Sequence, residues 1–214
     1  MTTKPVRIFL LEDHPVMRLG LKMMLEERGF EVCGEAENAE QALKLLPEAA
    51  ADVAVLDLSL QGETALQAVA ECRQRFPALA IIIYSMHDTP LFVESAMRAG
   101  ANGYVTKADP VAAIVNAIED VRQGKQHFGP SLARELQKQD SDLARQGLKL
   151  REITGRELEV LTLLGQGFGL AEIADRFCIS TRTVETHLNH LREKLGVKTN
   201  RELTRAAIQF LHPG

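Results

Sequence analysis

Short apolar runs alternate with helical patterns along the first 121 residues, and no other feature constrains the fold as strongly. The runs at 6–11, 53–56 and 80–84 are continuous, which is typical of strands buried on both faces. A weaker run surrounds Val32, and residues 103–105 predict a short last strand. Strands that alternate with helices indicate a doubly wound α/β domain around a five-stranded parallel sheet. The helices are expected at about 16–28, 39–46, 64–76, 91–99 and 111–122.

The last third of the chain differs, because helical patterns follow one another there without a strand signal. Gly, Pro and polar residues dominate the preceding stretch, which indicates a linker, with a small third domain as the alternative. We therefore predict a first domain at 4–122, a linker at 123–149 and an all-α four-helix domain at 150–212. Its helices are expected at about 155–165, 170–177, 181–195 and 200–211.

The composition is that of an ordinary globular protein. Of the 214 residues, 45% are apolar and 25% are charged, which argues against disorder and fibrous architectures. The longest purely apolar run, 78–84, is far shorter than the roughly 20 residues that span a bilayer, and no signal-peptide pattern opens the chain. The three cysteines are widely spaced and form no C-x-x-C pair, which fits a reducing compartment. We therefore expect a cytoplasmic protein without membrane contact.

The net charge of −4 is unevenly distributed along the chain. Residues 1–121 hold 10 Lys and Arg against 18 Asp and Glu, a net charge of −8. Residues 153–214 hold 8 against 7, a net charge of +1, and from Arg182 onward six basic residues face three acidic ones. The two domains are therefore expected to have different partners, and only the last segment has the charge of a nucleic-acid footprint.

Polar side chains follow the predicted strands at the point where each strand ends. Glu12 and Asp13 directly follow the first strand and Asp57 the third, while Ser85 and Lys107 follow the next two. Because the carboxyl ends of parallel strands meet at one edge of a sheet, these side chains should converge. Carboxylates are ligands that Mg²⁺ prefers, and acids, hydroxyl and lysine together outline a phosphoryl-transfer site. The alternative is that strand ends are polar because they leave the core.

Four pieces of the first domain form one specific pattern: Leu11-Glu12-Asp13-His14, Asp57-Leu-Ser-Leu60, Ser85, and Gly103-Tyr-Val-Thr-Lys107. With them, residues 4–122 resemble the receiver domain of two-component response regulators, which has a flavodoxin-like fold. The resemblance implies that Asp57 attacks the phosphohistidine of a sensor histidine kinase and becomes the phosphoacceptor.

The resemblance also implies roles for the residues around the acceptor. Ser85 and Lys107 would sense the phosphoryl group. Mg²⁺ would be held by Glu12, Asp13, Asp57 and the backbone carbonyl of Ser59.

Three further positions carry a conformational or kinetic role in receivers. Tyr104 takes the aromatic switch position and would fill the space that Ser85 vacates after phosphorylation; an ordinary half-buried edge-strand aromatic is the alternative. Ser59 and His87 lie two residues past Asp57 and Ser85, where they would tune dephosphorylation, and ordinary surface polarity is the alternative.

The sequence departs from the receiver pattern at three positions. Gln61 and Ala108 stand where many receivers have proline, and Ala65 where many have glycine. None of these changes removes a group that the chemistry needs. They permit a degenerate receiver that regulates transcription without phosphorylation. An aspartate-nucleophile phosphatase is a weaker alternative, because Ser59 is not the second acid such enzymes need.

The helix at 181–195 has one apolar and one polar side. Thr181 is expected to cap its start, and Gly196 follows its end. A short helix, a tight turn and a longer helix with a polar outer face indicate a helix-turn-helix, although a plain αα-hairpin has the same pattern. The apolar stripe consists of Val184, Leu188, Leu191 and Leu195.

The last domain contains a second signature, made of Leu150 to Leu161, Glu172-Ile-Ala174, Ile179 to His187, and Leu191 to Val197. With it, residues 150–210 resemble the LuxR-type DNA-binding domain, and the order of the two domains is that of the NarL/FixJ class of response regulators. In that class the helix at 181–195 enters the major groove of promoter DNA, and the last helix is the usual dimer face. The resemblance therefore implies a homodimer on phosphorylation. The alternative role of the last helix is packing inside its own domain.

This resemblance implies two kinds of DNA contact, and a solvated helix face is the alternative for each residue. Glu185, Thr186 and Asn189 would face base edges. Contacts with phosphates, which position a protein without reading sequence, would come from Arg182, Arg192, Lys194, Lys198 and Arg201.

Overall fold

The computed structural model describes residues 4–58, 60, 65–88, 90–133 and 153–211. Contacts divide the chain into two compact units, residues 1–135 and residues 136–214. We call them the sheet unit and the helical unit. Among the described helices, none has the length and apolar character needed to cross a membrane.

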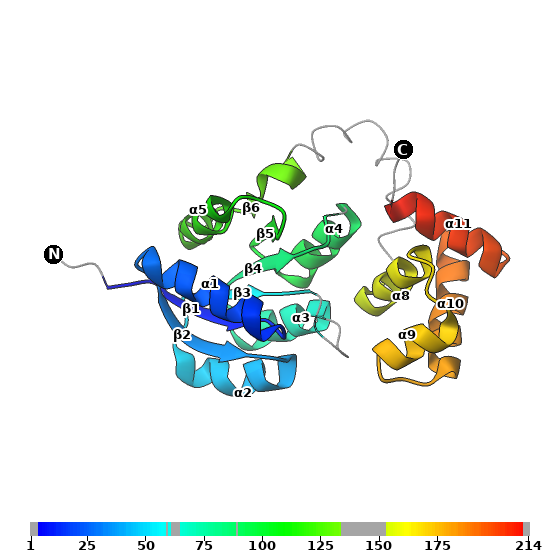
Figure 1. The fold of residues 1–214 in the computed structure, drawn as a ribbon, viewed down its shortest axis with the longest axis horizontal. Coiled ribbons are helices and arrows are strands. Elements are labelled where there is room, and N and C mark those ends of the chain that lie inside the picture. Colours follow the sequence, from blue (N-terminus) through cyan, green and yellow to red (C-terminus); the bar gives the residue numbers. More distant parts are fainter. Residues whose placement is uncertain (1–3, 59, 61–64, 89, 134–152, 212–214) are drawn as a thin grey trace. The chain divides into compact units, whose positions relative to one another are not determined.

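The sheet unit is built on a parallel sheet with the strand order β2-β1-β3-β4-β5-β6 (Figure 1). The order reverses at β1, so the carboxyl ends of β1 and β3 flank the switch point where ligands bind in doubly wound folds. The strands are β1 (Arg7–Leu11), β2 (Glu31–Ala36), β3 (Val53–Leu56), β4 (Ala80–Ser85), β5 (Gly103–Thr106) and β6 (His127–Phe128).

Five helices connect these strands. One face of the sheet carries an apolar core, in which Leu21 and Leu25 of α1 and Ile114 and Ile118 of α5 are buried against the strands. The strand residues that alternate with this core, such as Phe9, Leu56 and Ile83, are buried as well, so the strands are covered on both faces. This explains the continuous apolar runs. The helices are α1 (Pro15–Glu27), α2 (Ala39–Ala49), α3 (Ala65–Arg75), α4 (Pro90–Ala99) and α5 (Val111–Arg122).

The fold class is confirmed, but the expected strand number of five is wrong, because β6 adds a sixth strand. It lies inside 123–149, the range predicted to be a linker. β6 pairs in parallel with β5, with His127 opposite Gly103 and Phe128 opposite Tyr104. A two-residue strand is too short to show any periodicity. The domain boundaries at 122 and 149 themselves stay predictions.

The helical unit contains the four expected helices. Thr154 opens the first of them with a capping box, in which its side chain accepts from the Glu157 amide and the Glu157 carboxylate accepts from the Thr154 amide. Ser180, not the expected Thr181, caps α10, and Gly196 ends it in the left-handed conformation. The helices are α8 (Gly155–Gly165), α9 (Leu170–Arg176), α10 (Thr181–Leu195) and α11 (Asn200–Leu211).

Candidate functional site

The predicted site residues converge at the carboxyl edge of the sheet, because backbone hydrogen bonds continue past the strand ends. The Asp57 amide donates to the Leu11 carbonyl at 2.8 Å, and the Lys107 amide donates to the Ser85 carbonyl at 2.8 Å. Each site residue is therefore fixed by the strand beside it. Residues far apart in the sequence are placed side by side at the switch point.

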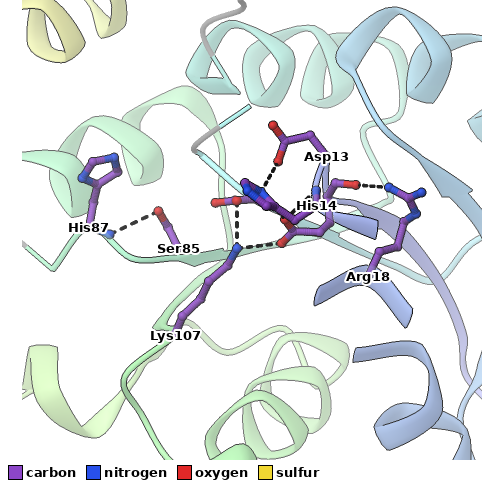
Figure 2. Close-up of polar contacts among 8 residues, drawn as sticks. Asp13, His14, Arg18, Ser85, His87 and Lys107 are labelled. Carbon is purple, nitrogen blue, oxygen red and sulfur yellow. Dashed lines mark hydrogen bonds and ion pairs between the residues drawn. The ribbon is translucent and has the colours of Figure 1, made fainter. Parts of the chain in front are cut away.

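A lysine joins two carboxylates at the centre of this edge (Figure 2). Lys107 Nζ lies 2.6 Å from Glu12 Oε2 and 2.8 Å from Asp57 Oδ2. The three side chains are only 7%, 3% and 2% exposed. Burial alone lowers the pKa of Lys107, but its hydrogen bonds and ion pairs with Asp57 and Glu12 raise that pKa above the ordinary value. The lysine is thus a permanent cation between the two acids.

Asp13 and His14 complete the cluster. Asp13 Oδ1 lies 2.9 Å from His14 Nδ1, which is also 3.6 Å from Glu12 Oε1. The ligand atoms of Glu12, Asp13 and His14 all lie within 4.8 Å of one another. Sequence reasoning included His14 in the motif without a role; its only signal was its position after Asp13.

The donor set at this edge fits a divalent cation. Glu12 and Asp57 face the ammonium of Lys107, and Asp13 lies beside Glu12, so three carboxylates and one ammonium give a formal charge of −2. Mg²⁺ is bound by one or two carboxylates together with water and substrate phosphate oxygens, so hard oxygen ligands with excess negative charge suit it. Ser59, whose carbonyl was a predicted ligand, lies outside the described residues, as does Gln61.

Ser85 and Tyr104 form a second, buried part of the site. Both side chains are inaccessible to solvent. The Tyr104 hydroxyl donates to the His87 carbonyl at 2.7 Å, and Ser85 Oγ accepts from the His87 amide, so both side chains are tied to the backbone of His87. Burial raises the pKa of Tyr104 far above its ordinary value. Tyr104 is therefore fully buried beside Ser85, and β6 rather than β5 forms the sheet edge.

His87 contributes its backbone to this arrangement, while its ring lies elsewhere. The His87 amide donates to Ser85 Oγ at 3.3 Å. Its imidazole stacks on Phe92 with ring centroids 4.2 Å apart, and Figure 2 shows the ring directed away from Lys107. Burial lowers the pKa of His87, although Asp57 and Asp88 act in the opposite direction.

In the helical unit, α10 has a buried and an exposed side as predicted. Val184, Leu188 and Leu191 are buried. The Thr186 hydroxyl donates to the Arg182 carbonyl at 3.0 Å, and Arg192 hydrogen-bonds the Asn189 side chain. The predicted DNA contacts that lie exposed are Arg182, Glu185, Thr186, Asn189, Lys198 and Arg201; Arg192 is partly buried.

Lys194 has a partner that the sequence did not predict. Its ammonium lies 2.6 Å from Glu157 Oε2, and Glu157 is buried. Burial raises the pKa of Glu157, but hydrogen bonds from Lys194 and Thr154 lower it to a net value below the ordinary one. This pair ties the start of α8 to the end of α10. Sequence reasoning missed it because the partners are 37 residues apart.

Two sequence families match the chain. Residues 8–119 match the response regulator receiver domain, and residues 151–207 match the luxR family of bacterial regulatory proteins. The oxygen regulatory protein NreC of Staphylococcus epidermidis is 31% identical over 212 residues, which covers 95% of this chain and 97% of that protein. NreC of Staphylococcus aureus is 32% identical over 211 residues, with the same coverage.

Solved structures of similar proteins share the fold. A LuxR-family two-component response regulator from Aurantimonas sp. SI85-9A1 is 37% identical with a TM-score of 0.61, covering 64% of this chain and 98% of that one. RcsB of Salmonella enterica serovar Typhimurium, bound to promoter rprA with the phosphomimetic BeF3−, is 24% identical. Its TM-score is 0.67, and the match covers 97% of this chain and 98% of that one.

Proposed function

The chain belongs to the NarL/FixJ class of response regulators, transcription factors that join a receiver domain to a LuxR-family DNA-binding domain, and we propose that phosphorylation of Asp57 controls its binding to DNA. One observation carries the proposal. Glu12 and Asp57, directly after the neighbouring strands β1 and β3, share the ammonium of Lys107 beside a buried Ser85. Three acids, a hydroxyl and a lysine at one sheet edge are the groups that phosphoryl transfer to a carboxylate needs.

The proposed reaction uses Asp57 as nucleophile. A carboxylate oxygen attacks the phosphorus of a phosphohistidine on a sensor histidine kinase; the P–N bond breaks and the leaving imidazole takes up a proton. An acyl phosphate forms on Asp57. Mg²⁺, held by Glu12, Asp13 and Asp57, would supply charge neutralisation on the phosphoryl oxygens. Lys107 Nζ, already 2.8 Å from Asp57 Oδ2, pairs with a phosphoryl oxygen in the product.

The signal would leave the site through Ser85 and Tyr104. New phosphoryl oxygens near Asp57 attract the Ser85 hydroxyl, whose oxygen accepts from the His87 amide at 3.3 Å. Because Tyr104 donates to the His87 carbonyl at 2.7 Å, a shift of Ser85 is transmitted to the segment that leads into α4. The charge added at Asp57 would thus shift the conformation of the packed segment before α4, as a two-state switch requires. The tuning role of His87 and Ser59 stays a prediction.

The output would be DNA binding through the exposed side of α10. Glu185, Thr186 and Asn189 face base edges in this proposal. The ammonium of Lys194 has three N–H donors, and one of them is bound to Glu157, so only the other two are left for a DNA phosphate. A helical domain with a net charge of +1 binds DNA weakly as a monomer, so dimerisation on phosphorylation would supply the affinity. The phosphate contacts are Arg182, Arg192, Lys194, Lys198 and Arg201.

A second candidate function is the regulation of transcription without phosphorylation. The departures from the receiver pattern at Gln61 and Ala108 favour it, because many receivers have proline at both positions. In that case the chain regulates transcription constitutively or through a protein partner.

The test is intact-mass spectrometry after incubation with Mg²⁺ and a small acyl-phosphate donor. The proposal predicts one adduct of phosphoryl mass on the wild type and none on Asp57→Ala. Asp88→Ala is the matched control, because Asp88 is an exposed aspartate directly after His87 and outside the carboxylate cluster. An unmodified wild type that still binds DNA would support the second candidate. Consumption of the donor without an accumulating adduct would support a phosphatase.

A further inference from the structure

Arg18, in the first turn of α1, folds back over the loop that carries the acidic residues. Its Nη1 donates to the Glu12 backbone carbonyl at 2.5 Å, and its Nη2 donates to Glu37 Oε1 at 2.9 Å. Its Nε lies 3.7 Å from Glu35 Oε2. The side chain is 14% exposed. Figure 2 shows Arg18 on the opposite side of the cluster from Ser85.

The contact completes the fixation of Glu12. The Glu12 amide donates to the Ala36 carbonyl at 3.1 Å, and Glu12 Oε2 accepts from Lys107. Arg18 satisfies the remaining polar group of this residue, its carbonyl. That carbonyl belongs to the peptide that joins Glu12 to Asp13. A rotation of this peptide would displace both carboxylates from their common centre.

The rest of the guanidinium is held by the β2 side of the sheet. Glu35 is in β2, and Glu37 directly follows the end of that strand. Arginine offers several donors in a rigid planar fork, so one end can hold a carbonyl while the other holds carboxylates. A lysine at this position would offer a single point charge. The geometry therefore depends on the arginine fork and not only on its charge.

We propose that Arg18 is a positioning residue for Mg²⁺: it fixes the Glu12–Asp13 peptide so that both carboxylates face one cation. The inference rests on the proposed function, because it concerns the metal that the phosphorylation site would hold. Residues behind metal ligands commonly change metal affinity 10–100-fold when they are removed.

The sign of the effect separates positioning from electrostatics. Arg18 is a cation close to the proposed site of a divalent cation. Removal of its charge alone would tighten Mg²⁺ binding, because like charges repel. Removal of a positioning contact would weaken Mg²⁺ binding instead. The two explanations therefore predict opposite changes in the dissociation constant.

The experiment measures Mg²⁺ binding to the full chain by isothermal titration calorimetry. For Arg18→Met we expect a dissociation constant about 10-fold higher than for the wild type, and for Arg18→Lys a smaller increase. Lys22→Met is the matched control. Lys22 is also in α1 and pairs with Glu35 at 2.6 Å, and the carboxylates near its ammonium are those of Glu35 and Glu26, not that of Glu12. This control should bind Mg²⁺ as tightly as the wild type or more tightly.

A second readout uses the rate of modification by the acyl-phosphate donor. The Mg²⁺ concentration at half-maximal rate should rise for Arg18→Met, while the rate at saturating Mg²⁺ stays within about twofold of the wild type, since positioning acts through the metal site. Unchanged or tighter Mg²⁺ binding by Arg18→Met would overturn the inference. A lower maximal rate with an unchanged Mg²⁺ concentration at half-maximal rate would overturn it as well. If Arg18→Met does not fold, Arg18→Lys decides the question, because it keeps the positive charge and loses the planar fork. A raised dissociation constant for Mg²⁺ then supports positioning, and an unchanged one overturns it. A wild type that forms no adduct would refute the proposed function and not the role of Arg18 in metal binding.

Discussion

Replacement of Lys107 by methionine should destabilise the sheet unit strongly when no divalent cation is present. The ammonium makes two charge-assisted hydrogen bonds, at 2.6 and 2.8 Å, to carboxylates that are 3% and 2% exposed. Methionine fills a similar volume but leaves Glu12 and Asp57 facing each other without a cation between them. Breaking a buried ion pair from one side costs about 3–5 kcal/mol. That is a large share of the roughly 5–15 kcal/mol by which a domain is stable.

Tyrosine fluorescence during denaturation by urea measures this loss. The chain has two tyrosines and no tryptophan, and both tyrosines, Tyr84 and Tyr104, are in the sheet unit. The signal therefore follows the unit that carries the cluster. In EDTA we expect the free energy of unfolding of Lys107→Met to fall by about 3 kcal/mol or more. Added Mg²⁺ should stabilise the variant more than the wild type, because the cation replaces the missing charge.

Lys44→Met provides the matched control for this experiment. Lys44 Nζ lies 2.6 Å from Glu40 Oε1, the same separation as in the buried pair, but both side chains are 72% exposed. Solvent screens such a pair, so its loss should not change the unfolding midpoint measurably. The reasoning is refuted if Lys107→Met in EDTA loses no more stability than Lys44→Met.

Three further predictions concern other parts of the chain. Burial raises the pKa of Glu159 from 4.5 to about 7, so the stability of the helical unit should fall by up to about 3 kcal/mol as pH rises from about 4.5 to 7; carboxyl NMR on the full chain should show the raised midpoint, and Glu159→Gln should remove the pH dependence. Gly129→Ala should destabilise the sheet unit by about 1–3 kcal/mol in urea denaturation, because a Cβ there would lie 2.3 Å from Asp109 Oδ2; an unchanged midpoint would contradict this. Asn189→Ala should relax DNA specificity at one base pair, whereas Lys198→Ala should weaken binding to specific and random DNA alike; equal losses for both variants in a filter-binding assay would argue against the assigned groove contacts.

The sequence predicted the parts of the fold and site that follow from local pattern. Continuous apolar runs located the strands, and the rule that parallel strands end at one edge of a sheet predicted that Glu12, Asp57 and Lys107 converge. The structure confirms that convergence, with the lysine between the two acids. The four helices of the helical unit followed from their 3.6-residue periodicity in the same way.

Features that depend on tertiary contacts were missed. β6 has two residues and owes its place to pairing with β5, extended by the hydrogen bond from the Gly129 amide to the Tyr104 carbonyl. The partnership of Lys194 with Glu157 arises only when α8 and α10 pack together. No local pattern encodes a contact between helices that are separated by a third helix.

Contacts that involve backbone atoms also could not be predicted from the sequence. Arg18 reads as an ordinary polar residue of an amphipathic helix, yet its guanidinium reaches the Glu12 carbonyl. His87 attracts notice as a titratable residue near Ser85, but its amide and carbonyl make the contacts while its ring stacks on Phe92. Backbone partners of this kind leave no signal in the type or spacing of residues.

The central claim, that Asp57 is the phosphoacceptor, is tested most directly by locating the phosphoryl group. Borohydride reduces an aspartyl phosphate to homoserine, so the full chain is incubated with Mg²⁺ and the acyl-phosphate donor, reduced, digested and sequenced by mass spectrometry. We predict homoserine at position 57 and at no other aspartate, with the signal abolished by EDTA. Reduction at Asp13 in place of Asp57, or no reduced residue in a folded chain supplied with Mg²⁺, would contradict the account.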